Sequence, residues 1–293
     1  MCLDSNFIGS DTLYEIIHII YLITSFLIRS QFQLPMHPDE LNRERLLKIR
    51  AILFDLHHTI TKTRVSMITL TKETAKDAGI NLEHIADNVL AEAIKKTDQW
   101  ARKYQVENSV DIHWGTRPEE WLEINRLFID NLEIKGVSDE MLLSFERNWK
   151  TTMATNFESP VEGAEITLQK LRDRGYILGL CTRRNDDPEK LLVRWNIHHL
   201  FSTIHWTGVP GYAKPSPFTL LKAAEDININ PWLCAYVGNY VDADVAAARR
   251  AEMLPILTTW ANPDEKGLAN DDMLIIDKID ELLNLFSRQL NLP

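Results

Sequence analysis

The sequence predicts an α/β fold, in which a doubly wound parallel sheet is accompanied by a smaller all-helical domain. Apolar runs alternate with helical patterns in the C-terminal half, and the first apolar run, at residues 51–54, ends abruptly in Asp55. Between residues 62 and 155 the hydrophobic spacing is helical, with few strand-like runs. Strands that alternate with helices form right-handed βαβ units, which build a parallel sheet with helices on both faces.

The most hydrophobic segment, residues 13–28, lies in a predicted N-terminal helical extension at residues 1–49. It is shorter than a membrane-spanning helix usually is and contains Glu15 and His18, so membrane association is not expected. Acidic residues precede it and no small-residue cleavage site follows it, which argues against a signal peptide. We interpret it as a helix that docks on the body of the protein, with a membrane-surface helix as the weaker alternative. A third interpretation is that Met36 is the true start.

The first core strand is predicted at residues 51–54 (AILF), because four apolar residues without alternation suit a strand that is buried on both faces. Asp55 follows directly and is placed at the carboxyl end of this strand, where open α/β sheets bind their ligands. Asp55 is therefore the first catalytic candidate. The alternative is a carboxylate that only caps the turn after the strand.

A helical domain is predicted over residues 62–155. Its amphipathic patterns cover residues 65–78, 82–104, 119–132 and 138–149. Tryptophan is concentrated in this domain, at Trp100, Trp114, Trp121 and Trp149. Aromatic residues at helical spacing usually form a core, so we interpret these chiefly as packing residues, with the lining of a substrate pocket as the alternative.

From Ser159 onward strands and helices alternate, so residues 50–61 and 156–293 together form the predicted α/β core. Strands are predicted at residues 176–181, 203–206, 233–237 and 255–258. Helices are predicted at residues 160–174, 187–195 and 215–225, and in a segment that ends at Ala251. Gly175 suits the end of the first of these helices, and Pro215 suits the start of the third.

The composition limits the possible functions. With 32 basic and 42 acidic residues the net charge is −10, and no long basic run occurs, so nucleic-acid binding is not expected. Cys2, Cys181 and Cys234 lie far apart without metal-ligand spacing, which favours neither disulfides nor a zinc site and suits a cytoplasmic protein. Cys181 and Cys234 lie in or beside apolar runs and are interpreted as buried packing residues. No pattern specifies an oligomeric state.

Polar side chains that can perform chemistry follow the predicted strands. They are Asp55 with Thr59, Thr182 with Arg183, Lys214, and Asn239 with Asp242 and Asp244. Because parallel strands end at one edge of their sheet, these residues are expected to converge there. A carboxylate nucleophile, a hydroxyl, an ammonium and an acidic loop that binds Mg²⁺ suit phosphoryl transfer, so a small anionic, phosphorylated substrate is predicted.

This order of motifs resembles the haloacid-dehalogenase-like (HAD) hydrolase superfamily, in the subgroup with a helical cap inserted after the first catalytic strand. The resemblance covers residues 50–286 and includes PVEGA at 160–164, KPSP at 214–217 and VGNYVDADVAAA at 237–248. It implies a Rossmann-like core and, most often, a phosphatase that acts on a small phosphomonoester through an aspartyl-phosphate. It implies Asp55 as nucleophile, Thr182 as phosphate binder, Lys214 as charge neutraliser, and the loop at 239–244, through Asn239 and Asp244, as metal ligand. Beside these, Thr59 and Arg183 are predicted to bind substrate, and Asp55 and the His57 carbonyl to bind Mg²⁺.

Two residues depart from the family's phosphatase pattern. His57 replaces the aspartate that normally protonates the leaving group and then activates water, a role worth about 10²–10⁴-fold in rate. An imidazole can perform these proton transfers, and the alternative is a loop-filling His57 whose carbonyl still binds metal. Asn239 replaces an aspartate, and its neutral amide should bind Mg²⁺ more weakly unless Asp242 or Asp244 compensates. The alternative role for Asp244 is that of a helix N-terminal acid.

These departures leave three interpretations. The favoured one is a Mg²⁺-dependent phosphatase with a catalytic His57. The second is a catalytically impaired relative that serves as a binding protein, and the third is a metal-independent, 2-haloacid-dehalogenase-type hydrolase. Arg183 and Arg184 could bind a second anionic group of the substrate, or one could pair with Asp186 or Asp187 while the other is solvated.

Overall fold

The computed structural model describes residues 42, 44–155, 157–288 and 290 of the chain. The hydrophobic segment at residues 13–28 and Met36 lie outside the described residues, so the predictions for them stay predictions. Within the described ranges, no helix is both long enough and apolar enough to cross a membrane.

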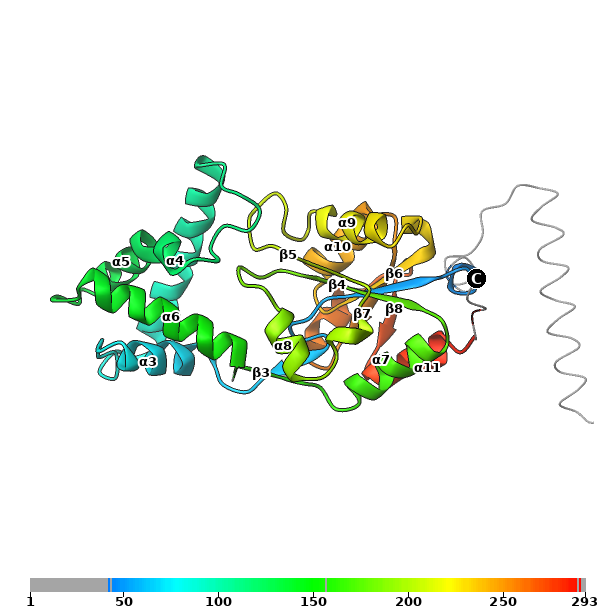
Figure 1. Ribbon diagram of the computed structural model, residues 1–293, viewed down its shortest axis with the longest axis horizontal. Coiled ribbons are helices and arrows are strands. Elements are labelled where there is room, and N and C mark those ends of the chain that lie inside the picture. The colour runs from blue at the N-terminus through cyan, green and yellow to red at the C-terminus, as the bar shows by residue number, and fades with distance from the viewer. Residues whose placement is uncertain (1–41, 43, 156, 289, 291–293) are drawn as a thin grey trace, which may run out of the picture.

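A six-stranded parallel sheet forms the centre of the molecule and confirms the predicted fold class (Figure 1). Its strands are β1 (Ala51–Phe54), β4 (Ile177–Thr182), β5 (Thr203–Trp206), β6 (Cys234–Gly238), β7 (Leu254–Thr258) and β8 (Leu274–Ile276). Their order is β5-β4-β1-β6-β7-β8, so the chain winds outward from β1 in both directions. This topology places the carboxyl ends of β1, β4 and β6 side by side.

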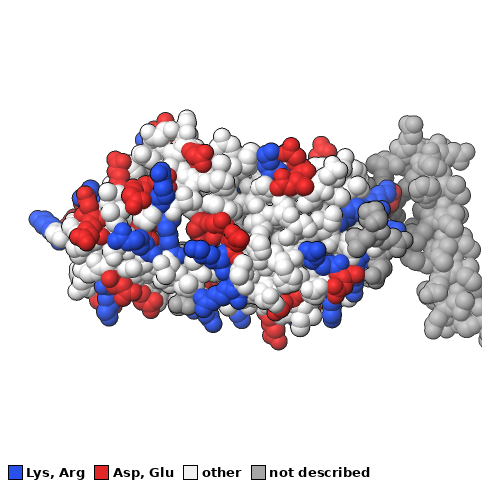
Figure 2. Space-filling view, viewed as in Figure 1, with Lys and Arg blue, Asp and Glu red and all other residues white. Residues whose placement is uncertain are grey.

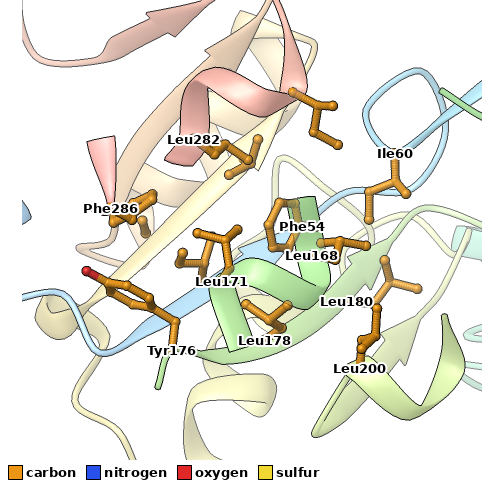
Figure 3. Close-up of a cluster of buried hydrophobic side chains, with 14 of the residues drawn as sticks. Phe54, Ile60, Leu168, Leu171, Tyr176, Leu178, Leu180, Leu200, Leu282 and Phe286 are labelled. Carbon is orange, nitrogen blue, oxygen red and sulfur yellow. The ribbon is translucent and has the colours of Figure 1, made fainter. Parts of the chain in front are cut away.

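Different helices cover the two faces of the sheet. They are α7 (Ala164–Asp173), α8 (Glu189–Arg194), α9 (Phe218–Asp226), α10 (Ala246–Arg250) and α11 (Leu282–Leu285). Ile52 and Phe54 pack with α7, α8 and α11, in the core that Figure 3 draws around Phe54. Ala51 and Leu53 pack against α9 and α10 on the opposite face, because successive strand side chains point to opposite faces. All of β1 is therefore buried, which explains its unbroken apolar run.

Four helices form a group at one end of the molecule, which we call the helical unit (residues 67–155; left in Figure 1). They are α3 (Met67–Asp77), α4 (Asp87–Glu107), α5 (Leu122–Asn131) and α6 (Asp139–Thr155), with a 3₁₀ turn η1 (Pro118–Trp121) before α5. Their apolar faces enclose a core of their own, in which the rings of Phe128 and Phe145 stack with centroids 6.2 Å apart. Ser66 caps the first turn of α3 by accepting a hydrogen bond from the Thr69 backbone N–H.

A two-stranded antiparallel ribbon joins the helical unit to the sheet. Strand β2 (Thr61–Thr63) pairs with β3 (Glu158–Pro160), so the chain leaves the sheet after β1 and returns to it through adjacent strands. The ribbon places Glu158 beside the loop after β1, where its Oε2 accepts a hydrogen bond from the Thr61 hydroxyl (2.5 Å).

Several predicted element boundaries are wrong. The helix predicted at residues 160–174 begins only at Ala164, because Pro160 pairs in the ribbon. Pro215 does not begin a helix, since α9 starts at Phe218. The sequence analysis missed β2, β3 and β8 because each strand has only three residues, too few for a periodic signal.

Candidate active site

Three strand ends meet at one edge of the sheet, and each carries a predicted site residue. Asp55 follows β1, Thr182 ends β4 and Asn239 follows β6. The Asp55 backbone N–H donates a hydrogen bond to the Val237 carbonyl in β6 (2.9 Å), which fixes the start of the catalytic loop against the neighbouring strand. The convergence expected from parallel strands therefore occurs for these three positions.

Lys214 brings a positive charge to this edge from a loop. Strand β5 ends at Trp206, so the prediction that Lys214 directly follows a strand is wrong, and a loop returns it to the sheet edge. Its Nζ lies 2.6 Å from Asp55 Oδ1, 2.5 Å from Asp244 Oδ1 and 2.8 Å from the Tyr236 hydroxyl. All four side chains are buried, so two carboxylates share one ammonium away from water.

Burial and charge have opposite effects on the pKa values in this cluster. Burial raises the pKa of Asp55, and the charge of Lys214 opposes that rise. Burial would lower the pKa of Lys214, but the carboxylates of Asp244 and Asp55 outweigh it, and that pKa is raised. Lys214 therefore stays protonated, and it is the group that opposes protonation of Asp55.

Asp244 is fixed by the loop that it closes. Its Oδ2 accepts hydrogen bonds from the backbone N–H groups of Asn239 (2.9 Å) and Tyr240 (3.0 Å). Gly238 permits this approach, because a Cβ at that position would lie 2.4 Å from the Asp244 side chain. Asp242, the other acid of the loop, is exposed. Asp244 is thus the acid of this loop that reaches the buried cluster.

Thr59 links Asp55 to Asn239. The Thr59 hydroxyl lies 3.4 Å from Asp55 Oδ2 and 3.3 Å from Asn239 Oδ1, while Asn239 Nδ2 is buried without a hydrogen-bond partner among the described residues. If the Asn239 amide is turned over, Nδ2 donates to Thr59, Thr59 donates to Asp55, and the amide oxygen becomes the free buried atom. Such an oxygen beside a buried carboxylate suits an oxygen-liganded cation such as Mg²⁺.

The donor set nevertheless differs from a cluster of acids. Within the described ranges, no group of three His, Cys, Asp or Glu side chains could hold a metal ion. Both oxygens of Asp244 are held by short hydrogen bonds, to Lys214 and to backbone N–H groups, whereas the side-chain contact of Asp55 Oδ2, with the Thr59 hydroxyl, is long (3.4 Å). The residues present therefore fit a Mg²⁺ site built on Asp55 and neutral oxygen ligands, which predicts weak binding.

Thr182 presents a hydroxyl at the end of β4. Its Oγ1 is buried and has no hydrogen-bond partner within the part of the chain that the structure describes. A buried polar group without a partner is costly, so this hydroxyl is suited to donate to an oxygen of a bound phosphate group.

His57 faces a carboxylate that the sequence analysis did not identify. Its Nδ1 lies 3.3 Å from Oε1 of Glu158, whose side chain is fully buried, whereas that of His57 is 35% exposed. The same Oε1 accepts a hydrogen bond from Arg184 Nη1 (2.7 Å). Burial alone would raise the pKa of Glu158, but His57, Arg184 and Thr61 outweigh it and lower the pKa to about 2. A carboxylate that is itself held by Arg184 and Thr61 thus contacts the His57 ring at Nδ1.

Replacing Glu158 by Gln should destabilise the protein in a pH-dependent way. The folded-state pKa of about 2 lies below the ordinary value of 4.5, so the carboxylate contributes stability above pH 4.5 that is lost as the pH falls toward 2. The difference corresponds to about 3 kcal/mol at pH 7. Urea unfolding from pH 7 to pH 3 measures it, with the exposed Glu162→Gln as the matched control. A loss of equal size at every pH would contradict the assigned ionisation.

The two arginines after Thr182 lie in different environments. Arg184 is buried and donates two hydrogen bonds to Asp186 (3.1 and 2.8 Å) in addition to its bond to Glu158. Arg183 is exposed, has no hydrogen bond or ion pair to the residues that the structure describes, and lines a cavity beside His57. The alternative in which one arginine pairs with Asp186 and the other faces solvent is the arrangement found, and Arg183 stays a candidate for substrate binding.

Two residues of this site were missed by the sequence analysis. Tyr236 lies within the apolar run of β6, where an aromatic residue is expected to be core, yet its hydroxyl contacts Lys214 and donates to the Cys181 carbonyl (2.8 Å). Glu158 gives no local signal except its position just before the PVEGA segment. Cys181 itself is buried and unpaired, as predicted.

A parallel α/β sheet with a buried aspartate–lysine cluster at the carboxyl ends of its strands is typical of one class of hydrolases. A comparison with protein-family models shows which class this is. The model for haloacid dehalogenase-like hydrolases matches residues 49–252 of the chain. The chain therefore belongs to the haloacid dehalogenase-like hydrolase family, as its motifs suggest.

Similar proteins include phosphatases and a dehalogenase. A glyceraldehyde 3-phosphate phosphatase of Methanopyrus kandleri is 31% identical over 123 residues, covering 41% of this chain and 53% of the relative. A phosphoglycolate phosphatase of Xylella fastidiosa is 28% identical over 141 residues, covering 45% and 56%. The chain thus spans about half the length of these relatives. A solved 2-haloacid dehalogenase of Pseudomonas syringae has a similar fold (TM-score 0.57, 20% identity, covering 82% of this chain and 98% of that chain). The fold alone does not separate the two chemistries, so the choice depends on the site.

Proposed function

We propose that this protein is a phosphatase that acts on a small phosphomonoester. The phosphoryl group is transferred to Asp55, and the resulting aspartyl-phosphate is then hydrolysed. The observation that carries the proposal is the buried cluster in which Asp55 and Asp244 share the Lys214 ammonium. The partnerless Thr182 hydroxyl on the adjacent strand supports it. The names of the two relatives point to phosphate esters as well.

In the first half-reaction, a carboxylate oxygen of Asp55 attacks phosphorus and the bond from phosphorus to the ester oxygen breaks. Lys214 and Thr182 are proposed to stabilise the charge on the transferring phosphoryl oxygens, which is the main catalytic contribution in phosphoryl transfer. Arg183 is proposed to contact the substrate from the solvent side. In the second half-reaction, water attacks phosphorus, inorganic phosphate leaves and the Asp55 carboxylate is regenerated.

His57 is proposed as the proton carrier of both half-reactions. It would donate a proton to the departing alcohol and then accept one from the attacking water, as an acid and base must in a two-step displacement. Its contact with Glu158 (3.3 Å) supports this role, because it holds the ring in one orientation.

Mg²⁺ is proposed as the cofactor. Asp55, Asn239 and the His57 backbone carbonyl would hold it, with Asp244 fixing the loop that carries Asn239. When bound, the ion supplies positive charge to the phosphoryl oxygens. We also propose that residues 62–155 form the cap and that the rest of the α/β fold forms the core. A cytoplasmic location is proposed because the two described cysteines are unpaired, which suits a reducing compartment.

Phosphate release from a panel of phosphomonoesters tests this proposal with the full-length protein. We expect turnover with Mg²⁺, a fall toward background in EDTA, and a phosphoryl group on the Asp55 peptide after an acid quench, detected by mass spectrometry. Halide release from 2-haloacids in EDTA, with no phosphate released from any ester, would replace the proposal by a dehalogenase. Binding of phosphate esters without turnover would indicate the impaired binding protein.

A further inference from the structure

A cavity of about 580 Å³ lies between the helical unit and the catalytic edge of the sheet. Its lining includes His57, which is two residues from Asp55, and Arg183, which follows Thr182. The volume is in the range of sites that enclose drug-sized ligands and equals that of roughly 20 water molecules. A two- or three-carbon phosphate ester would fill only a small part of it.

The inner wall of this cavity is largely apolar and aromatic. Trp121, Phe128, Phe145 and Trp149 come from the helical unit, and Phe157 comes from the segment just before β3. Methionine and aliphatic side chains complete the apolar part of the lining. Two of the four tryptophans that the sequence concentrates in this region thus border the same space as His57 and Arg183. Rings in such a wall favour an apolar, ring-sized occupant.

The charges that line the cavity are balanced in number, and two of its four cations are held by protein carboxylates. Four basic and four acidic residues contribute, and Figure 2 shows both signs interspersed over the helical unit. Arg184 is bound to Glu158 and Asp186, and Lys150 lies 3.4 Å from Glu146. Protein carboxylates neutralise Arg184 and Lys150, so of these three cations only Arg183, beside Thr182, is left to contact an anionic group, and we assign that contact to the phosphate.

Two residues of the lining carry buried polar atoms that have no partner among the described residues. Thr97 Oγ1, from α4, and Asn185 Oδ1, from the loop after β4, have no hydrogen-bond partner within the described ranges. Both residues line the cavity. Asn185 Oδ1 lies against the Gly208 backbone, where a Cβ would approach it to 1.9 Å, so this atom faces the protein and leaves the ring-lined wall as the surface that selects an occupant.

We propose that the alcohol part of the substrate is neutral, ring-sized and largely apolar, rather than a two- or three-carbon acid. This inference rests on the proposed phosphatase function and names the substrate class of the same site. It differs from what the relatives' names suggest, because glycolate carries a second anionic group and glyceraldehyde is small and polar. The phosphate would lie beside Asp55, with the ring between Trp121 and Trp149.

Three esters with similar alkyl leaving groups test the proposal: ethyl phosphate, 2-phenylethyl phosphate and 2-phosphoglycolate. For the full-length protein with Mg²⁺, we expect kcat/KM for 2-phenylethyl phosphate to exceed that for ethyl phosphate by about 10- to 100-fold, mainly through KM. 2-Phosphoglycolate should be no better than ethyl phosphate. Equal values for the first two esters, or a preference for 2-phosphoglycolate, would overturn the proposal.

A variant with a larger side chain in the cavity tests whether the substrate ring binds there. Ala91 lines the cavity and is exposed on α4, so Ala91→Trp narrows the space at small cost to folding. The ring preference, measured as the ratio of kcat/KM for 2-phenylethyl phosphate to that for ethyl phosphate, should fall to within about threefold. Val89→Trp, at an exposed α4 position outside the lining, is the matched control and should keep the preference. Retention of the preference in Ala91→Trp would place the ring elsewhere and contradict the assignment.

A binding measurement separates failure of this inference from failure of the proposed function. Asp55→Asn should bind 2-phenylethyl phosphate at least tenfold more tightly than ethyl phosphate, followed by tryptophan fluorescence, whether or not the wild type hydrolyses either ester. Tight binding without wild-type turnover would reject the phosphatase and keep the cavity assignment. Equal binding of both esters would reject the cavity assignment alone.

Discussion

The Asp55→Asn variant should release phosphate at least ~10⁴-fold more slowly than wild type while keeping its fold. The exchange removes the attacking carboxylate but leaves its shape, and Lys214 retains Asp244 as its charged partner. Burial already raises the pKa of Asp55, so the folded state does not depend on a charge at this position. Phosphate release at saturating substrate measures the first effect, and the urea midpoint, expected near that of wild type, measures the second.

Comparing Asp55→Asn with His57→Ala shows which residue receives the phosphoryl group. The His57→Ala variant keeps the Asp55 nucleophile, so a phosphoryl group should still appear on the Asp55 peptide, although turnover falls by about 10²–10⁴-fold. The Asp55→Asn protein should give no such peptide. Phosphate release within tenfold of wild type in Asp55→Asn would show that another group attacks phosphorus.

The sheet was predictable because its strands are buried on both faces. Each residue of β1 packs into one of two cores, which produces the unbroken apolar run that identifies the strand. The ribbon was not predictable, because its two strands have three residues each and pair only after the whole helical unit has intervened. The helix was predicted to begin at Pro215 because proline suits the first turn of a helix. Proline also suits a loop, and here Pro215 belongs to the loop that positions Lys214, with α9 starting at Phe218.

Part of the site was predictable for a similar reason. Asp55, Thr182 and Asn239 follow or end parallel strands, and topology alone brings such positions together. Glu158 was not predictable, because its contact with His57 depends on how the ribbon folds against the loop after β1. Tyr236 was not predictable either. The apolar pattern of β6 indicates that its ring is buried, but it does not indicate that its hydroxyl contacts Lys214.

The two departures from the family pattern have a common electrostatic consequence. Asp55, Asp244 and Lys214 together carry one net negative charge in the buried cluster. Aspartates at positions 57 and 239 would add two more negative charges beside it, and a divalent cation would then be needed to offset them. With His57 and Asn239 in these places, Lys214 supplies most of the counter-charge that the nucleophile requires. The chain is therefore expected to depend on Lys214 to an unusual degree.

Replacing Lys214 by Met should lower kcat by about 10³-fold and destabilise the protein by about 3–5 kcal/mol at pH 7. The variant leaves the buried carboxylates of Asp55 and Asp244 without their shared counter-charge. Burial and the charge of Asp244 already raise the pKa of Asp55, and removing Lys214 takes away the charge that opposes this rise, so the variant loses stability as the pH rises through the raised pKa. The deficit relative to wild type should therefore shrink as the pH falls toward 4.

Urea unfolding at pH 7.5 and pH 4.5, together with phosphate release, measures both effects of Lys214→Met. The matched control is Lys222→Met, which removes an exposed lysine paired with Glu225 in α9 and should change stability by less than about 1 kcal/mol. A stability deficit that grows in acid would mean that Asp55 and Asp244 do not repel one another in the variant. The shared ammonium would then contribute through hydrogen bonding rather than charge, and the argument for its dominant role would fail.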